Sequence, residues 1–237
     1  SARKPTSWAD NTNPPNNQPS PTFSGTTTLI GGDGDDTLVG SDGDDSFVGG
    51  SGTDRILQTA GTNQTLTDTS LSGRGNDAVS DVEEADLTGD GSNNVLDTSG
   101  FSGTVTLSGL GGDDTLWGAA GNDSLDGGDG TDLVAQSVDA DQVLNDSVLT
   151  GDGNDSISSI ERADLTGGDS ANTINAAGFG RGPVTLSGAG GDDTLSGSPD
   201  DDVLEGGENL FERQGDQSLD LFGSRVLVSR RDANAGR

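Results

Sequence analysis

Residues 31–57 read GGDGDDTLV, GSDGDDSFV and GGSGTDRIL, which are three nine-residue units in direct succession. Each unit opens with glycine, carries aspartate at its sixth position and has an apolar residue at its eighth. The pattern returns in residues 109–135 and again in 188–205. A tandem repeat of this kind predicts a solenoid, in which neighbouring units stack to build a shared core. The sixth positions are Asp36, Asp45, Asp54, Asp114, Asp123, Asp132, Asp193 and Asp202.

A longer period of 78 residues, the super-repeat, contains the nine-residue one, since residues 94–101 recur as 172–179. Degenerate copies of the nonapeptide fill the stretches between the three blocks, so the repeat runs through residues 21–207. The ends differ: residues 1–20 are rich in proline and asparagine, and residues 208–237 lack the pattern. We therefore expect an N-terminal arm or linker at 1–20, a solenoid domain at 21–207, and a C-terminal cap or tail with a candidate hairpin at 208–237.

The spacing of the repeat sets the expected shape of one coil. A strand rises about 3.3 Å per residue, so nine residues suit one short strand and one tight turn, and two units make a coil of about 18 residues. The sixth positions at Asp54, Asp77, Asn94 and Asp114 follow one another at intervals close to this length. Pairs such as Thr37-Leu38 place one side chain outward and one apolar side chain inward. The expected fold class is all-β, a right-handed parallel β-roll or β-solenoid with irregular coils between the nonapeptide blocks.

Composition excludes several classes of function. Histidine and cysteine are absent, so the chain has no Ser-His-Asp triad, no thiol nucleophile and no ordinary zinc site. The net charge of −30 disfavours binding to nucleic acid or insertion into a membrane. Hydrophobic residues make up only 27%, which is typical of disordered chains, but disorder would not preserve an apolar eighth position. The acidic body therefore needs a positive partner in order to fold.

The units GGDGDDTLV, GGSGTDRIL and GGDGTDLVA resemble the Gly-Gly-x-Gly-x-Asp-x-apolar-x repeat of RTX (hemolysin-type) calcium-binding proteins. The resemblance implies a β-roll module that binds several calcium ions, each between two turns that lie one coil apart. The chemistry agrees, because Ca²⁺ prefers six to eight carboxylate and carbonyl oxygens, and glycine lets a turn expose its carbonyls.

On this resemblance Asp36 pairs with Asp54, and Asp114 pairs with Asp132. Carbonyls near each pair are expected to complete the two sites: Gly31, Asp33, Gly49 and Ser51 for the first, and Gly109, Gly111, Gly127 and Asp129 for the second. The other sixth-position aspartates are less regular. Asp193 has no aspartate one coil further along the chain, Pro199 disturbs the turn before Asp202, and Asp45 and Asp123 face the opposite edge. Asp77 and Asp155, in the degenerate copies, are open between calcium ligands and turn-forming residues.

We expect calcium binding and folding to be one event, because without the ion the acidic residues repel one another and little apolar surface is buried. The resemblance implies a secreted or cell-surface module with a structural or binding role, and no catalysis by this chain. Two alternatives stay open. One is a calcium-dependent, self-associating surface, filament or adhesin subunit that uses the arm or the tail. The other is a part of a polysaccharide-modifying enzyme, which the scarcity of arginine and tryptophan in the body disfavours.

Overall fold

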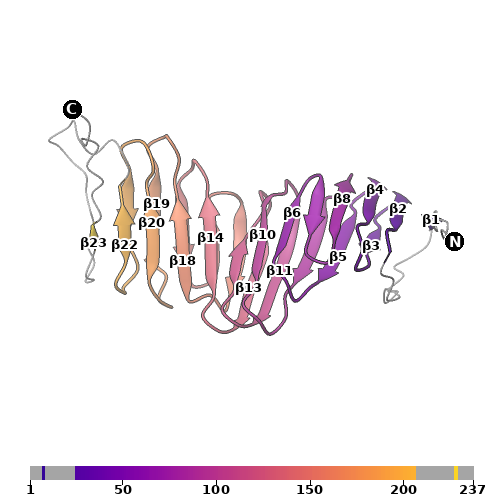
Figure 1. The fold of residues 1–237 in the computed structure, drawn as a ribbon. Coiled ribbons are helices and arrows are strands. Elements are labelled where there is room, and N and C mark those ends of the chain that lie inside the picture. The colour runs from indigo at the N-terminus through magenta and orange to yellow at the C-terminus, as the bar shows by residue number, and fades with distance from the viewer. Residues whose placement is uncertain (1–6, 9–24, 207–226, 229–237) are drawn as a thin grey trace, which may run out of the picture.

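The computed structural model describes residues 25–206, together with the backbone of two short strands, β1 (Ser7–Trp8) and β23 (Leu227–Val228). The described residues form an elongated stack of strands that follows chain order from one tip to the other (Figure 1). Most of the expected arm and cap, and the candidate hairpin, lie outside the described residues. In the part of the chain that is described, no helix is long and apolar enough to cross a membrane.

Two sheets build the stack, one of 13 strands and one of ten. Besides β1 and β23, the first sheet contains β2 (Thr28–Asp33), β4 (Ser46–Ser51), β6 (Gln64–Thr67), β7 (Ser70–Ser72), β8 (Asn76–Ser80), β10 (Val95–Gly100), β12 (Thr115–Trp117), β14 (Leu133–Ser137), β18 (Arg162–Thr166), β20 (Val184–Ser187) and β22 (Val203–Glu205). The second contains β3 (Thr37–Val39), β5 (Arg55–Thr59), β9 (Glu84–Thr88), β11 (Thr104–Gly111), β13 (Ser124–Asp129), β15 (Gln142–Asn145), β16 (Val148–Thr150), β17 (Asn154–Ser158), β19 (Thr173–Gly178) and β21 (Thr194–Ser196). Parallel pairs dominate, which confirms the expected all-β solenoid.

The core is a column of apolar side chains, and the nonapeptide places them. Eighth-position residues of successive coils lie in register, as Leu38 with Ile56 and Leu116 with Val134. None of these four side chains is more than 5% exposed. The intervening residues alternate outward, because successive side chains of a strand point to opposite faces. Since one coil contributes only a few apolar groups, its burial depends on the coils that stack against it.

Two antiparallel meanders interrupt the parallel stack where irregular coils were expected, and the sequence did not predict the direction of their strands. Strands β6, β7 and β8 pair antiparallel within the first sheet, and β15, β16 and β17 do so within the second. The extra two strands lengthen the coil, so Asp77 does not stack on Asp54. Its carboxylate instead accepts the N–H of Asp45, 32 residues earlier.

A pair of buried glutamines anchors each meander. Gln58 Nε2 donates to Gln64 Oε1 at 3.0 Å and to the carbonyl of Ser72 at 3.1 Å. Gln64 Nε2 in turn donates to the carbonyl of Thr88 at 2.8 Å. The same bonds recur one super-repeat later at Gln136 and Gln142. The amides thus tie each meander to the strands beside it, and the carbonyls of Thr88 and Thr166 accept them in addition to the N–H groups of Ala60 and Val138.

Corresponding strands of successive super-repeats lie in different sheets. Moving one super-repeat along the chain advances an odd number of strands, so β4 of the first sheet corresponds to β13 of the second. The turns that end at Asp36 and Asp54 lead into the second sheet, whereas those that end at Asp114 and Asp132 lead into the first. The two nonapeptide blocks therefore present their aspartates on opposite edges of the solenoid.

Candidate metal centre

Sixth-position aspartates form ladders that join one coil to the next. Asp54 Oδ1 accepts the backbone N–H of Asp36 at 2.8 Å, and Asp132 Oδ1 accepts that of Asp114 at 2.7 Å. The two expected pairs are thus each brought together, one coil apart. The ladders continue to glutamates that the nonapeptide pattern did not reveal: Glu83 Oε2 accepts the N–H of Asp54, and Glu161 Oε2 that of Asp132.

A free carboxylate oxygen marks five of these turns. Although the Oδ2 atom is buried in each, it accepts no hydrogen bond from the described residues; the five are Asp36, Asp54, Asp114, Asp132 and Asp193. A buried oxygen without a donor is costly, and more so when it carries negative charge. We call these five the open turns.

Backbone conformation explains why the oxygen is free. In every open turn the second and fourth residues of the unit have positive φ; they are Gly32 and Gly34, Gly50 and Gly52, Leu110 and Gly112, Gly128 and Gly130, and Ala189 and Gly191. In the turns that end at Asp45 and Asp123, the second residues, Ser41 and Ala119, do not have positive φ. Their N–H groups donate to Oδ2 at 2.6 and 2.7 Å. We call these the closed turns, since both carboxylate oxygens are occupied.

Each free oxygen shares its surroundings with a backbone carbonyl at the two expected pairs. A methyl group added at Gly109 would lie 2.1 Å from Asp114 Oδ2 and 2.5 Å from the Gly127 oxygen. One added at Gly31 would lie 2.7 Å from Asp36 Oδ2 and 2.5 Å from the Gly49 oxygen. Carboxylate and carbonyl oxygens therefore converge on one small space, as hard cations such as Ca²⁺ require.

Comparison with protein families also indicates calcium binding. The model of the RTX calcium-binding nonapeptide repeat matches in four copies, at residues 22–56, 99–134, 144–159 and 185–209. The chain carries RTX calcium-binding nonapeptide repeats. Such repeats bind calcium, form structural and generally non-enzymatic modules, and occur typically in proteins that bacteria secrete. A comparison with curated proteins found no match.

The open turns of this RTX chain have oxygen-only surroundings built largely from backbone. Within residues 25–206 no three acidic side chains converge in a way that would hold a metal by themselves, so carbonyls have to complete each site. The carbonyls of Asp81 and Ser159, from the irregular coils, border the same spaces as Asp54 Oδ2 and Asp132 Oδ2. Of the other expected carbonyls, those of Ser51 and Asp129 already accept N–H groups from Gly34 and Gly112.

The RTX closed turns are organised differently. Asp45 Oδ1 accepts the N–H of Thr27 and Asp123 Oδ1 that of Val105, so each side chain holds two backbone donors. Asp202 accepts the Val184 N–H at 2.9 Å and the Ser198 hydroxyl at 2.8 Å through the same oxygen. These three aspartates are engaged in joining coils and closing turns.

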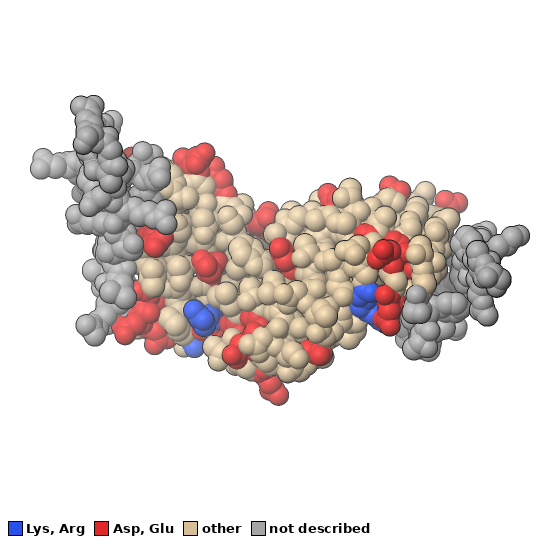
Figure 2. Space-filling model, viewed as in Figure 1, with Lys and Arg blue, Asp and Glu red and all other residues tan. Residues whose placement is uncertain are grey.

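Uncompensated charge accumulates along the ladders. Burial raises the pKa of Asp54, Asp114, Asp132 and Asp193, and neighbouring carboxylates raise each of them further. On the face shown in Figure 2, acidic side chains are spread along the body whereas basic ones gather at few places. Within residues 25–206 the fold thus holds negative charge that the side chains of this part do not neutralise.

Proposed function

We propose that this chain is an extracellular RTX module whose folding is driven by calcium bound at the open turns. The observation that carries the proposal is the coincidence of three features in the same five turns: positive φ at two positions, a buried free carboxylate oxygen and, at four of them, an adjacent carbonyl. Closed turns have the same aspartate but leave no oxygen free. The sequence motif alone does not separate the two kinds.

The proposed ligands follow from this geometry. Asp36 and Asp54, with carbonyls of Gly49 and Asp81, serve one edge; Asp114 and Asp132, with carbonyls of Gly127 and Ser159, serve the other. Gly31 and Gly109 leave the space open by having no side chain. Asp193 extends the set into the third block, since its turn has the same backbone.

The residues themselves account for coupling between the ion and the fold. When bound, calcium supplies positive charge and accepts six to eight oxygen ligands. Asp54, Asp114 and Asp132 each span two coils, because Oδ1 accepts the N–H of one coil while Oδ2 lies beside a carbonyl of the next. Without a cation the stacked carboxylates repel one another in a chain that has little apolar surface to bury. Binding energy then becomes folding energy.

Far-UV circular dichroism during a calcium titration tests the proposal, with magnesium as the control ion. We expect a transition from coil to β structure with calcium only, because Mg²⁺ demands a tighter octahedral shell and dehydrates reluctantly. A chain in which Asp36, Asp54, Asp114 and Asp132 are all changed to Asn should need far more calcium. A β spectrum that persists in chelator would contradict the proposal. Light scattering in the same titration distinguishes a folded monomer from a calcium-dependent assembly.

A further inference from the structure

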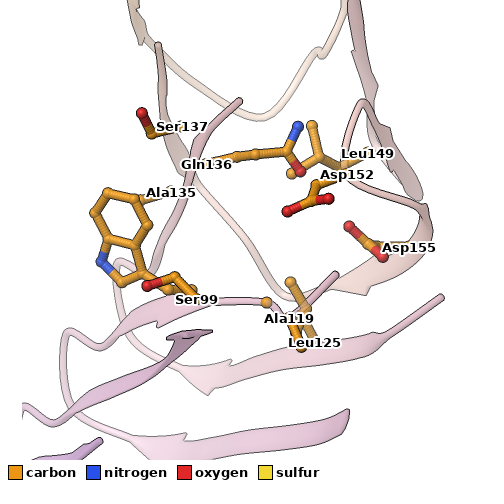
Figure 3. Close-up of a pocket in the computed structure, with 11 residues that line it drawn as sticks. Ser99, Ala119, Leu125, Ala135, Gln136, Ser137, Leu149, Asp152 and Asp155 are labelled. Atoms are coloured by element: carbon orange, nitrogen blue, oxygen red, sulfur yellow. The ribbon is translucent and has the colours of Figure 1, made fainter. Parts of the chain in front are cut away.

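A cavity of about 40 Å³ lies beside the meander of the second sheet, outside the five open turns (Figure 3). Its lining combines apolar side chains with one amide and two carboxylates, namely Trp117, Leu125, Leu149, Gln136, Asp152 and Asp155. A polar space of this size is large enough for a small solute group or a few water molecules.

Three acceptors in this lining have no donor from the described residues. Asp155 is only 2% exposed; its Oδ1 accepts the N–H of Asp123 at 2.9 Å, and its Oδ2 accepts nothing. Gln136 is 8% exposed and donates both Nε2 hydrogens, which leaves its Oε1 free. The Asp152 carboxylate has no hydrogen bond in residues 25–206, and Figure 3 shows it between Gln136 and Asp155. Burial, with the charges of Asp123 and Asp152, raises the pKa of Asp155 to about 7.

The first super-repeat has a cation at the place that corresponds to this cavity; here residues 40–77 of the first super-repeat correspond to residues 118–155 of the second. Arg74 stands one super-repeat before Asp152, and Asp77 stands one super-repeat before Asp155. The positive charge of Arg74 lowers the pKa of Asp77, opposing the effect of burial. Asp152 has the opposite effect on Asp155. Arg74 also forms an ion pair with Asp42, whose counterpart 78 residues later is Ala120. The first place therefore has two carboxylates and one cation, whereas the second has two carboxylates and no cation.

The first super-repeat also fills the equivalent space with an aromatic ring. Phe47 Cζ comes within 2.6 Å of the position where a side chain at Gly40 would begin. At the equivalent place Leu125 Cδ1 stays 3.7 Å from the corresponding position at Gly118. The cavity and the unbalanced charge thus arise together, from two differences between the super-repeats.

We propose that this cavity binds the primary ammonium group of a small alkylamine. Its three N–H donors match the free oxygens of Gln136, Asp152 and Asp155, and its alkyl carbons suit the apolar walls. An aromatic side chain such as Trp117 also favours an organic cation. A calcium ion fits this space less well than it fits an open turn. The strand beside β17 is the antiparallel β16, so no following parallel turn supplies carbonyls there.

The test uses the full chain in saturating calcium, with ethylammonium as the probe. The Trp8→Phe background leaves Trp117 as the only tryptophan, so its fluorescence reports binding. We expect saturable one-site binding at constant ionic strength. Asp152→Asn should weaken it at least tenfold. Leu125→Phe, which introduces the residue that the first super-repeat carries, should abolish it. Asp126→Asn removes an exposed carboxylate of β13, the strand that contains Leu125, and should change the affinity for ethylammonium less than twofold.

Far-UV circular dichroism in calcium shows whether each variant keeps the fold. If Asp152→Asn unfolds the chain, Leu125→Phe still tests the proposal. The proposal is overturned if the wild-type chain shows no saturable binding, which would mean that the cavity holds water. Equal binding by the Leu125→Phe variant, or equal effects of ethylammonium and potassium, would also overturn it. If raising calcium tenfold above saturation displaces ethylammonium, the cavity is a metal site and the ammonium assignment is wrong. None of these outcomes depends on which open turns bind calcium.

Discussion

Changing Asp114 to asparagine should stabilise the calcium-free fold and weaken the calcium-bound one. Asp114 Oδ1 accepts the N–H of Asn94 at 2.6 Å, a bond that an amide oxygen can keep. The free Oδ2 and the oxygen of Gly127 both lie within 2.5 Å of the place where a side chain at Gly109 would begin, so two acceptors border one small space. An amide NH2 in place of Oδ2 puts a donor opposite that carbonyl and removes a buried charge.

Both effects can be given a size. One net intramolecular hydrogen bond contributes about 0.5–1.5 kcal/mol, so the calcium-free fold should gain about 1 kcal/mol. Loss of an anionic ligand should weaken calcium binding at least tenfold, which corresponds to about 1.4 kcal/mol. Urea unfolding in chelator, with trimethylamine oxide added to populate the fold, measures the first quantity. Calorimetric calcium titration measures the second.

Asp123→Asn is the matched control, because it makes the same chemical change in a closed turn. Both oxygens of Asp123 hold N–H groups, from Val105 and Ala119, and an amide has only one oxygen. The variant should lose about 1–3 kcal/mol with or without calcium, and its calcium affinity should not change. If the two variants shift stability in chelator in the same direction, the distinction between open and closed turns is refuted.

Three further predictions concern the scaffold, and a fourth concerns pH. Gly128→Ala should destabilise the fold by at least about 2 kcal/mol, since φ is 101° and the added methyl would lie 2.3 Å from a backbone oxygen; thermal melting in calcium measures this. Ala189→Gly should stabilise it by about 1 kcal/mol in the same assay, because glycine relieves the strain of a positive φ, and a lower midpoint would contradict this. Gln64→Leu should cost about 1–3 kcal/mol in urea unfolding, because it removes the side-chain donor to the Thr88 carbonyl and takes the acceptor Gln64 Oε1 from the buried Gln58 amide. In chelator, with trimethylamine oxide again added to populate the fold, stability should rise as pH falls from 8 to 5: the pKa of Asp155 is raised to about 7, so the folded chain binds more protons than the unfolded chain in that range. A urea midpoint that is lower at pH 5 than at pH 8 would show the reverse sign.

The nonapeptide predicts the strands and the inward residues, because both depend on positions within one unit. The pairing of aspartates one coil apart is expected from the resemblance to RTX proteins. The nonapeptide does not predict the meanders. Between Gln64 and Ser80 the alternation of polar and apolar residues suits a strand of either direction, and direction is fixed by pairing with β4 and β10. The glutamines gave a signal of the meanders, because they recur at buried positions in both super-repeats: Gln58 and Gln64, then Gln136 and Gln142.

The difference between open and closed turns is only partly local. Glycine at the second position, as in Gly32, permits positive φ, and Ser41 at the same place accompanies a closed turn. Leu110 and Ala189 break this rule, since they adopt φ of 74° and 65° without being glycine. Stacking against neighbouring coils imposes that conformation, and a single unit does not contain the information. The ladder role of Glu83 is equally remote, because its longer side chain acts across 29 residues.

The odd number of strands in the super-repeat governs how such a chain can bind many targets at once. Duplicating one super-repeat preserves both sheets but turns every surface feature to the other side of the rod. A flat target can therefore engage only every second unit, whereas two targets on opposite sides can each engage alternate ones. Avidity toward one surface then grows by one contact for every two units added.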